Sequence, residues 1–507
     1  MCQVDEHYEE GLERAEVPSV SRKCVKCKEA EATVVIRAGD SFCRTCFREY
    51  FIHKFRAMLG KNRIIFPGEK VLLAVSGGPS SSSMLRQVQE GLSQNAHKKL
   101  RFCPGIIFID EGGVVGQSVE QRRRTAGELL TVFRAAGFPV HMVPLEQVLD
   151  LPSSILASAS LASKRTASSY KVAVDRFVRT DGGSSLTPQD QEVMLLPPVN
   201  QSQTQALQQL MMSATTLTAR QELLNTLRLH LLVHTARSKG YNKVMLGDNG
   251  TRAAVKLVSS IALGRGAQLA QDTGFSDSRF GDIILVRPMR DYSAKEISYY
   301  NYLFSVPSVF IPALDTKTVD KSSIQHLTEI FITKLQADFP STVSTVYRTS
   351  EKLQTVCRGP STPEHTTRCL LCVCDLDTAT EEASAFQATL TSEQLSVGPS
   401  GAARTETQRQ DPVGLNQAAP PRQCCPSGGG AEDCGRAASG GGCCSSARLL
   451  VGSDLRSLLC YSCQLMVKDL ASVESLPHYI LSEAQRRQRR SQMRDEISDF
   501  LLGDDEG

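Results

Sequence analysis

The fold is decided by the stretch Val71-Leu-Leu-Ala-Val75-Ser76-Gly77-Gly78-Pro79-Ser80-Ser81-Ser82-Ser83. Five apolar residues lead into a Gly-Gly turn and a run of hydroxyl side chains, and an amphipathic segment follows from about Met84. This order predicts a buried strand, a tight loop and a helix, which together open an α/β domain. Backbone N–H groups in such a loop, at the N-terminus of a helix, favour an anion such as a phosphate.

The same rhythm continues along the chain. Further apolar runs at 105–109, 140–143, 243–246 and 283–287 predict strands, and amphipathic segments at 122–136 and 221–239 predict helices between them. Fully apolar strands separated by helices predict a parallel, doubly wound sheet covered on both faces. In such a sheet the ligand crevice lies at the carboxyl ends of the strands. The candidate nucleotide-binding residues are therefore Ser76, Gly77, Gly78, Ser80, Ser81, Gly247 and Asp248.

The cysteines predict two metal sites. Two Cys-x2-Cys pairs some fifteen residues apart match the ligand spacing of a structural zinc site, and a reducible dithiol or coincidence are the alternatives. A second site would join one pair before a low-complexity segment to one pair after it, with Cys374 as a spare ligand for Cys372. The proposed metal ligands are Cys24, Cys27, Cys43 and Cys46 in the first site, and Cys369, Cys372, Cys460 and Cys463 in the second.

Composition limits the function classes. With 507 residues, 41% hydrophobic and 22% charged, the chain has ordinary globular composition. It has no apolar run long enough to span a membrane, and an acidic N-terminus where a targeting peptide would be basic, so we expect a cytoplasmic protein and no disulfide framework. Between Arg22 and Arg63, eleven basic residues oppose four acidic ones, a balance of 11 − 4 = +7. The candidate RNA-binding residues in this stretch are Arg22, Lys23, Lys26, Lys28, Arg44 and Arg48; a solvated surface is the alternative.

These features divide the chain into the following expected parts. They are a disordered acidic lead (1–20), an N-terminal zinc ribbon with a basic helix (21–62), an α/β domain (63–350) with an insertion (151–220), a split C-terminal zinc module (351–375 and 447–480), a disordered loop (376–446) and a C-terminal helix with an acidic tail (481–507).

The stretch from Val71 to Ser81 resembles the pyrophosphate loop, or PP-loop, of the N-type ATP pyrophosphatases, whose pattern is Ser-Gly-Gly-x-Asp-Ser. The paired knuckles, Gly247-Asp-Asn-Gly250 and Arg287-Pro-Met-Arg290 with Glu296 are similar to tRNA 2-thiolation enzymes, and most to the second subunit of the cytosolic thiouridylase. The resemblance covers most of the chain. It implies a PP-loop fold and a heterodimer with the first, catalytic thiouridylase subunit. The pair would thiolate the wobble uridine, U34, of the tRNAs for Lys, Glu and Gln, with sulfur from a ubiquitin-related carrier.

The chain departs from the family pattern where chemistry is expected. Pro79 and Ser80 stand where a Lys and the Asp usually stand, so the loop lacks a phosphate-facing cation and a carboxylate. Such losses weaken transition-state stabilisation by several kcal/mol. We align Gln221 and Leu224 with the cysteines that handle sulfur in active relatives, so no iron–sulfur cluster and no catalytic residue are predicted on this chain. Asp248 replaces the usual His, and Thr251 and Arg252 replace an acidic pair.

Three hypotheses follow. The first is a degenerate, non-catalytic subunit that binds tRNA and a catalytic paralogue. The second is an autonomous ATP-dependent tRNA-uridine sulfurtransferase. The third is a zinc-stabilised protein-interaction scaffold without an RNA role. The first accounts for the scaffold, the cysteine pairs, the basic stretch and the altered loop together. Whether ATP still binds is left open by the sequence.

Overall fold

The computed structural model describes residues 23–37, 39–93, 99–156, 170, 172–174, 197, 199–316, 322–349, 368–376 and 455–498. The expected acidic lead, Arg22, most of the expected loop at 376–446 and the acidic tail after 498 lie outside the described residues, as does much of the insertion expected at 151–220. In the part of the chain that is described, no helix is both long and apolar enough to cross a membrane.

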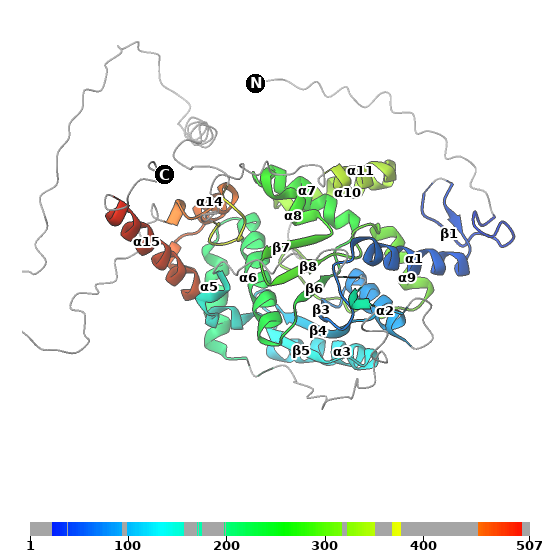
Figure 1. Ribbon diagram of the computed structural model, residues 1–507, viewed down its shortest axis with the longest axis horizontal. Helices are drawn as coiled ribbons and strands as arrows, with labels where there is room; N and C mark the ends of the chain where they lie inside the picture. The colour runs from blue at the N-terminus through cyan, green and yellow to red at the C-terminus, as the bar shows by residue number, and fades with distance from the viewer. Residues whose placement is uncertain are drawn as a thin grey trace, which may run out of the picture. The chain divides into compact units, whose positions relative to one another are not determined.

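A six-stranded sheet forms the centre of the fold, with strand order β5-β4-β3-β6-β8-β7 (Figure 1). The strands are β3 (Lys70–Ala74), β4 (Cys103–Asp110), β5 (Val140–Pro144), β6 (Lys243–Leu246), β7 (Ser276–Phe280) and β8 (Ile283–Val286). All neighbours pair in parallel except β7, which runs antiparallel to β8 at the edge. The expected parallel sheet is confirmed. Strand β7 was not expected because its sequence, Ser-Asp-Ser-Arg-Phe, is polar, which suits an edge strand but gives no apolar pattern.

Helices cover both faces of the sheet. Successive residues of a strand point to opposite faces, and accordingly Leu72 belongs to one buried cluster whereas Val71 and Leu73 belong to the other. The doubly wound arrangement is therefore confirmed. The helices of the α/β domain that contains this sheet are α2 (Pro79–Leu92), α3 (Val119–Ala136), α5 (Gln201–Ser213), α6 (Leu217–Ser238), α7 (Gly250–Ala262), α8 (Leu269–Thr273), α9 (Ala294–Leu303), α10 (Ile324–Asp338) and α11 (Pro340–Thr349). The domain also contains the short 3-10 turns η1 (Leu145–Asp150), η2 (Ser153–Leu156) and η3 (Gly266–Gln268).

Helix α2 begins earlier than the sequence suggested. It starts at Pro79 rather than near Met84, because proline carries the backbone angle of a first helical residue and needs no hydrogen-bond acceptor there. The hydroxyl groups of Ser81 and Ser82 donate to the carbonyl oxygens of Gly78 and Gly77. The serine run is therefore the first turn of the helix, so the Gly-Gly turn lies directly at the helix N-terminus.

Two smaller modules flank the sheet. The N-terminal one contains β1 (Val34–Val35), β2 (Ser41–Phe42) and α1 (Arg44–Asn62). Helix α1 packs onto α9, where the rings of Phe51 and Tyr300 stack with centroids 3.9 Å apart. The C-terminal module contains residues 368–376, α14 (Tyr461–Lys468), the turn η5 (Val473–Ser475) and α15 (His478–Ser498). Helix α15 begins three residues before the start expected at residue 481.

Candidate metal centres and nucleotide crevice

The first four-cysteine group joins a tight Cys-x2-Cys turn, called a knuckle here, to the N-terminus of helix α1. The sulfur atoms of Cys24, Cys27, Cys43 and Cys46 all lie within 4.8 Å of one another. In the knuckle, Lys28 adopts a left-handed φ of 61° and its N–H donates to the carbonyl of Cys24 at 2.8 Å. Cys43 caps the N-terminus of α1, where its sulfur accepts the N–H of Cys46 at 3.5 Å.

The second group repeats this architecture at the other end of the chain. The sulfurs of Cys369, Cys372, Cys460 and Cys463 lie within 4.8 Å of one another. Val373 has a left-handed φ of 59°, its N–H donates to the carbonyl of Cys369 at 3.1 Å, and Cys460 is the N-cap of α14. A helix N-terminus favours negative charge, so both centres place two sulfurs where a thiolate is stabilised.

The spacing of the sulfurs suits a single ion. In a tetrahedral site with Zn–S bonds of about 2.3 Å, two sulfurs are about 3.8 Å apart. The sulfurs of Cys27 and Cys43 are 4.0 Å apart, and those of Cys372 and Cys460 are 3.6 Å apart. Cys374 lies outside the second group, and its sulfur accepts a hydrogen bond from Nη1 of Arg279 at 3.0 Å. Both donor sets therefore fit one tetrahedral ion each.

A buried histidine fixes the backbone of the second knuckle. His230, on α6, contacts the hydroxyl of Tyr479 through Nδ1 at 2.7 Å and the carbonyl of Leu371 through Nε2 at 2.8 Å. Burial lowers the pKa of His230 to about 4, so the ring is neutral. Because a carbonyl can only accept, the proton lies on Nε2, and Nδ1 accepts from Tyr479. The histidine thus ties α15 to the backbone between two metal-ligand positions.

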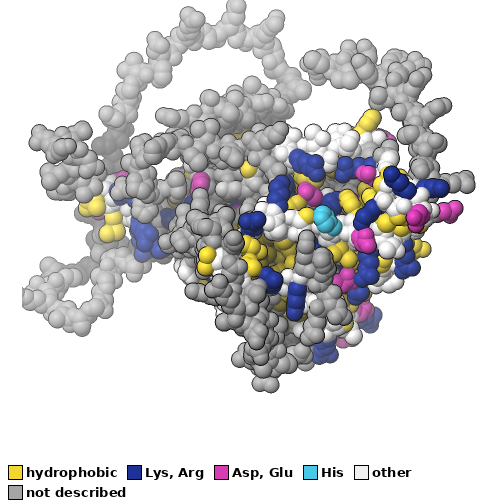
Figure 2. Space-filling view, turned by 45° about the vertical axis from the view of Figure 1, so that its right-hand side comes forward, with side chains coloured by type: hydrophobic (Ala, Val, Ile, Leu, Met, Phe, Trp, Pro, Cys, Tyr) yellow, Lys and Arg dark blue, Asp and Glu magenta, His cyan; other side chains and the backbone are white. Residues whose placement is uncertain are grey.

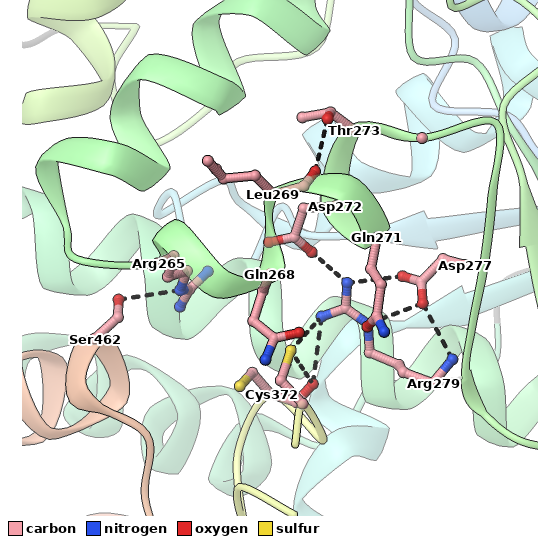
Figure 3. A network of polar contacts seen from close by, with 12 residues as sticks. Arg265, Gln268, Leu269, Gln271, Asp272, Thr273, Asp277, Arg279, Cys372 and Ser462 are labelled. Atoms are coloured by element: carbon pink, nitrogen blue, oxygen red, sulfur yellow. Dashed lines mark hydrogen bonds and ion pairs between the residues drawn. The ribbon is translucent and has the colours of Figure 1, made fainter. Parts of the chain in front are cut away.

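A chain of charges runs from this centre to the carboxyl ends of the strands, and it ends at the half-buried Asp248. Figure 3 shows Arg279 between Asp272, Asp277 and the second knuckle. The carboxylate of Asp277 also faces Nη2 of Arg287 at 3.7 Å, and Nε of Arg287 lies 3.5 Å from Asp248. Burial alone would raise the pKa of Asp248, but the positive charges of Lys256, Arg287 and Arg252 outweigh it and lower this pKa. Asp248 is therefore held as a carboxylate by cations of its own chain.

The Gly-Gly loop packs against the turn after β6. Gly77 has a φ of +80°, and the N–H of Val309 donates to its carbonyl at 2.9 Å. The side chain of Asn249 donates to the hydroxyl of Ser80 at 2.7 Å. A Cβ on Gly247 would lie 2.8 Å from Cα of Ser81. The loop and the 247–249 turn are thus packed together, and the Ser80 hydroxyl is used within the chain.

Three carboxylates near this edge also form ion pairs within the chain. Asp110, at the end of β4, and Glu146 both bind the buried guanidinium of Arg122, with N–O distances of 2.7 Å to each. Glu111 binds Arg228 of α6, with Nη2 of the arginine 2.9 Å from Oε2. Asp110 and Glu111 stand at the end of an apolar strand in the sequence, but nothing near them in the chain indicates the two arginines that bind them.

The positions aligned with sulfur-handling cysteines hold no thiol. Gln221 donates to the carboxylate of Asp315 at 3.2 Å, and Leu224 is buried in the core. Thr251 accepts the N–H of Ala294 at 3.0 Å. These side chains serve packing and hydrogen bonding of the fold.

Several candidate RNA contacts also have partners in the fold. Lys26 lies 2.6 Å from Glu49, and Arg48 lies 3.4 Å from Glu90. Arg44 donates to the carbonyl of Leu303 at 2.8 Å. Lys23 and Lys28 are exposed, and Arg22 lies outside the described residues. Figure 2 shows dark blue Lys and Arg side chains mixed with magenta Asp and Glu on the visible face. Glu90, which lies outside the basic stretch, offsets part of its charge excess through Arg48.

The family model and the curated relatives described below are named for tRNA 2-thiolation. A family model described as "Cytoplasmic tRNA 2-thiolation protein 2" matches residues 323–465. The protein of that name from Danio rerio is 54% identical over all of both chains, and the one from Homo sapiens is 51% identical over 99% of this chain and 98% of its own. Among solved structures, the U34-tRNA thiolase NcsA from Methanococcus maripaludis with its [4Fe-4S] cluster is 14% identical over 68% of this chain and 93% of its own, with a TM-score of 0.44.

Proposed function

Because this chain belongs to the cytoplasmic tRNA 2-thiolation protein 2 family, we propose that it is a subunit of the cytoplasmic machinery that thiolates the wobble uridine, U34, of the tRNAs for Lys, Glu and Gln. In this proposal it forms a heterodimer with a catalytic paralogue and helps to hold tRNA. The paralogue activates the uridine with ATP and inserts sulfur delivered by a ubiquitin-related carrier. The chain itself performs no bond-making step.

One observation carries the non-catalytic assignment. The loop from Ser76 to Ser81 keeps the geometry of an anion loop, yet its first helical turn begins with Pro79 and Ser80 in place of a cation and a carboxylate. Departure of pyrophosphate develops negative charge, and catalysis depends on fixed positive charge aimed at it. The hydroxyl of Ser80 instead accepts a hydrogen bond from Asn249. What is left is a weak or vestigial nucleotide crevice formed by the loop, Gly247 and Asp248.

We also propose that each four-cysteine group holds a structural zinc ion. The sulfur distances support one tetrahedral ion in each group, since the four thiolates of a four-iron cluster bind four different irons and stand farther apart than those around one ion. Zinc bound there would lock each knuckle to a helix N-terminus and has no redox chemistry to contribute.

Reconstitution of thiolation tests the functional proposal. The purified chain alone, the paralogue alone and the pair are each assayed for ATP–pyrophosphate exchange and for thiolation of tRNA Lys. We expect no exchange by this chain alone, and thiolation only by the pair. Exchange by this chain alone, abolished by Ser81→Ala with Gly78→Ala, would establish the autonomous enzyme instead.

Charge reversal separates the first hypothesis from the scaffold hypothesis. The six candidate residues are Arg22, Lys23, Lys26, Lys28, Arg44 and Arg48. Exchanging all six for Glu is expected to weaken tRNA binding, because phosphate contacts supply most of the affinity for RNA. Unchanged tRNA affinity, with normal assembly of the pair, would favour a scaffold without an RNA role in this module.

Metal analysis tests the zinc proposal independently of activity. Mass spectrometry of the purified chain should find two zinc ions per chain, and none after Cys24→Ser combined with Cys369→Ser. About one ion per wild-type chain, or iron in place of zinc, would refute the proposal.

A further inference from the structure

The C-terminal helix α15 has a docked half and a projecting half. In the first half Tyr479, Ile480 and Ala484 are at most 1% exposed. Arg487 continues the attachment, since it donates to the backbone carbonyls of Leu156 and Arg368. From 489 to 497, in contrast, every residue is exposed. The helix is thus held firmly at one end and carries its last two turns into solvent.

The exposed half continues the face by which the helix is docked. Residues three and four apart share one face of a helix, so the line through Ile480, Ala484 and Arg487 passes on to Arg490, Arg494 and Ile497. A helical protein partner packed along this line would require apolar residues at such positions. The line instead presents arginine at two of its three projecting positions, which suits an anionic partner.

The arginines on this half lack the ion pairs that the arginines nearer the core make, and Asp495 and Glu496, which follow them, bring the net charge of 489–497 to 3 − 2 = +1. Five arginines and no lysine or acidic residue occur between 486 and 494. Arg486 and Arg487 pair with the carboxylate of Glu483 at 2.7 and 2.9 Å. Within the described ranges, Arg489, Arg490 and Arg494 have no acidic partner. Like charges four residues apart on a helix destabilise it by about 0.2–0.5 kcal/mol, and a bound polyanion removes this repulsion.

We propose that Arg489, Arg490 and Arg494 form a contact surface for the sugar–phosphate backbone of tRNA, an assignment that rests on the proposed function. The planar guanidinium group matches phosphate oxygens in a bidentate manner, which favours arginine over lysine at phosphate contacts. Arg490 and Arg494 are about 6 Å apart along the helix axis, a spacing similar to that of consecutive phosphates along a strand. Met493 and Ile497, 63% and 52% exposed, lie beside them and offer apolar contact to ribose.

The test is a salt titration of tRNA binding by the full chain, alone and with its paralogue. The variant is Arg489→Gln/Arg490→Gln/Arg494→Gln, since Gln removes charge but keeps helix propensity. Loss of three phosphate contacts should make the slope of the logarithm of the binding constant against the logarithm of the salt concentration shallower by about 2. Raising the salt from about 50 to about 200 mM should therefore weaken tRNA binding by the variant about 20-fold less than it weakens binding by the wild type. A matched control carries Gln at three exposed arginines of α3, Arg123, Arg124 and Arg134, and should keep the wild-type slope.

The outcomes separate failure of the proposed function from failure of the α15 contact surface. If the wild-type pair does not bind tRNA, both the proposed function and this surface are refuted. If it binds tRNA and the α15 variant has the same slope and affinity, only this surface is refuted. An α15 variant that loses its protein partner but binds tRNA normally also refutes it and reassigns the helix to a protein contact. Equal helical circular dichroism of the variants confirms that all are folded.

Discussion

The buried guanidinium of Arg122 provides the sharpest test of how the crevice edge is built. We predict that Arg122→Met severely destabilises the protein. Arg122 is 3% exposed and joins Asp110, the last residue of β4, to Glu146, in η1. Methionine preserves the length and apolar stem of the side chain and helix propensity, so the change mainly removes the charge and its hydrogen bonds.

The size of the stability loss depends on the hydrogen bonds that Asp110 and Glu146 keep when Arg122 is replaced. Asp110 still accepts the N–H of Gly112 at 2.9 Å, and Glu146 still accepts the hydroxyl of Thr204 at 2.9 Å. Both nevertheless remain buried, with side chains 7% and 1% exposed, and no cation opposite. Removing one partner of a buried ion pair lowers stability by about 3–5 kcal/mol. The remaining neutral donors place the expected loss toward the lower end, about 3 kcal/mol.

Urea unfolding measures this loss, with Arg123→Met as the matched control. Arg123 is the next residue of α3 but is exposed, so its replacement should change stability by less than about 0.5 kcal/mol. Adding Glu146→Gln to Arg122→Met removes one stranded charge and should recover part of the loss, a coupling of about 1 kcal/mol or more. A loss below about 1 kcal/mol for Arg122→Met, or equal losses for the two arginines, would refute the assignment of Asp110 to the fold rather than to a ligand.

Three further predictions concern the loop, the C-terminal helix and the metals. Gly77→Ala should lower stability by about 1–2 kcal/mol in urea unfolding, because Gly77 has a left-handed φ and a Cβ would lie 2.7 Å from a leucine methyl group. Gly127→Ala, in open space on α3, should instead stabilise by up to about 1 kcal/mol. Burial would raise the pKa of Glu483, but hydrogen bonds from Arg486 and Arg487 outweigh it and lower this pKa. The stabilisation is therefore present at neutral pH and is lost as pH falls below the ordinary carboxyl value of 4.5. Glu483→Gln should abolish that part of the acid sensitivity in melting curves. Chelation of the metals should lower the melting temperature, and zinc rather than magnesium should restore it.

The sequence predicts the sheet well because buried parallel strands are almost wholly apolar. The run Val71 to Val75 and the strand at Lys243–Leu246 are recognised by composition alone. The edge strand Ser276–Phe280 is invisible to the same reasoning, since a polar edge strand resembles a loop. The cysteine groups are foreseeable because knuckle spacing is local, even where 88 residues separate Cys372 from Cys460.

The arginine partners are not foreseeable, because nothing local specifies them. Arg122 is 24 residues from Glu146, and Arg228 is 117 residues from Glu111. From the sequence, a carboxylate at the end of a parallel strand is a candidate ligand for a metal or nucleotide. Only the fold shows that an arginine from another element already occupies it. The same applies to Arg44 and Arg48, which look free in a basic stretch and yet contact Leu303 and Glu90.

The glycines of the loop do not themselves argue for a nucleotide. Gly77 is required by its left-handed backbone and by the neighbouring leucine, and Gly247 is required by the close approach of Ser81. Both requirements exist whether or not a phosphate ever binds, so a chain that has lost its chemistry still needs both residues to fold. Side chains whose only role is to face a phosphate are not required by the fold, so they can be replaced without unfolding the chain. This sequence departs from the PP-loop pattern at two such positions, Pro79 and Ser80. A retained Gly-Gly turn is therefore evidence for the fold, whereas the residues at the charged positions beside it are the evidence for or against catalysis.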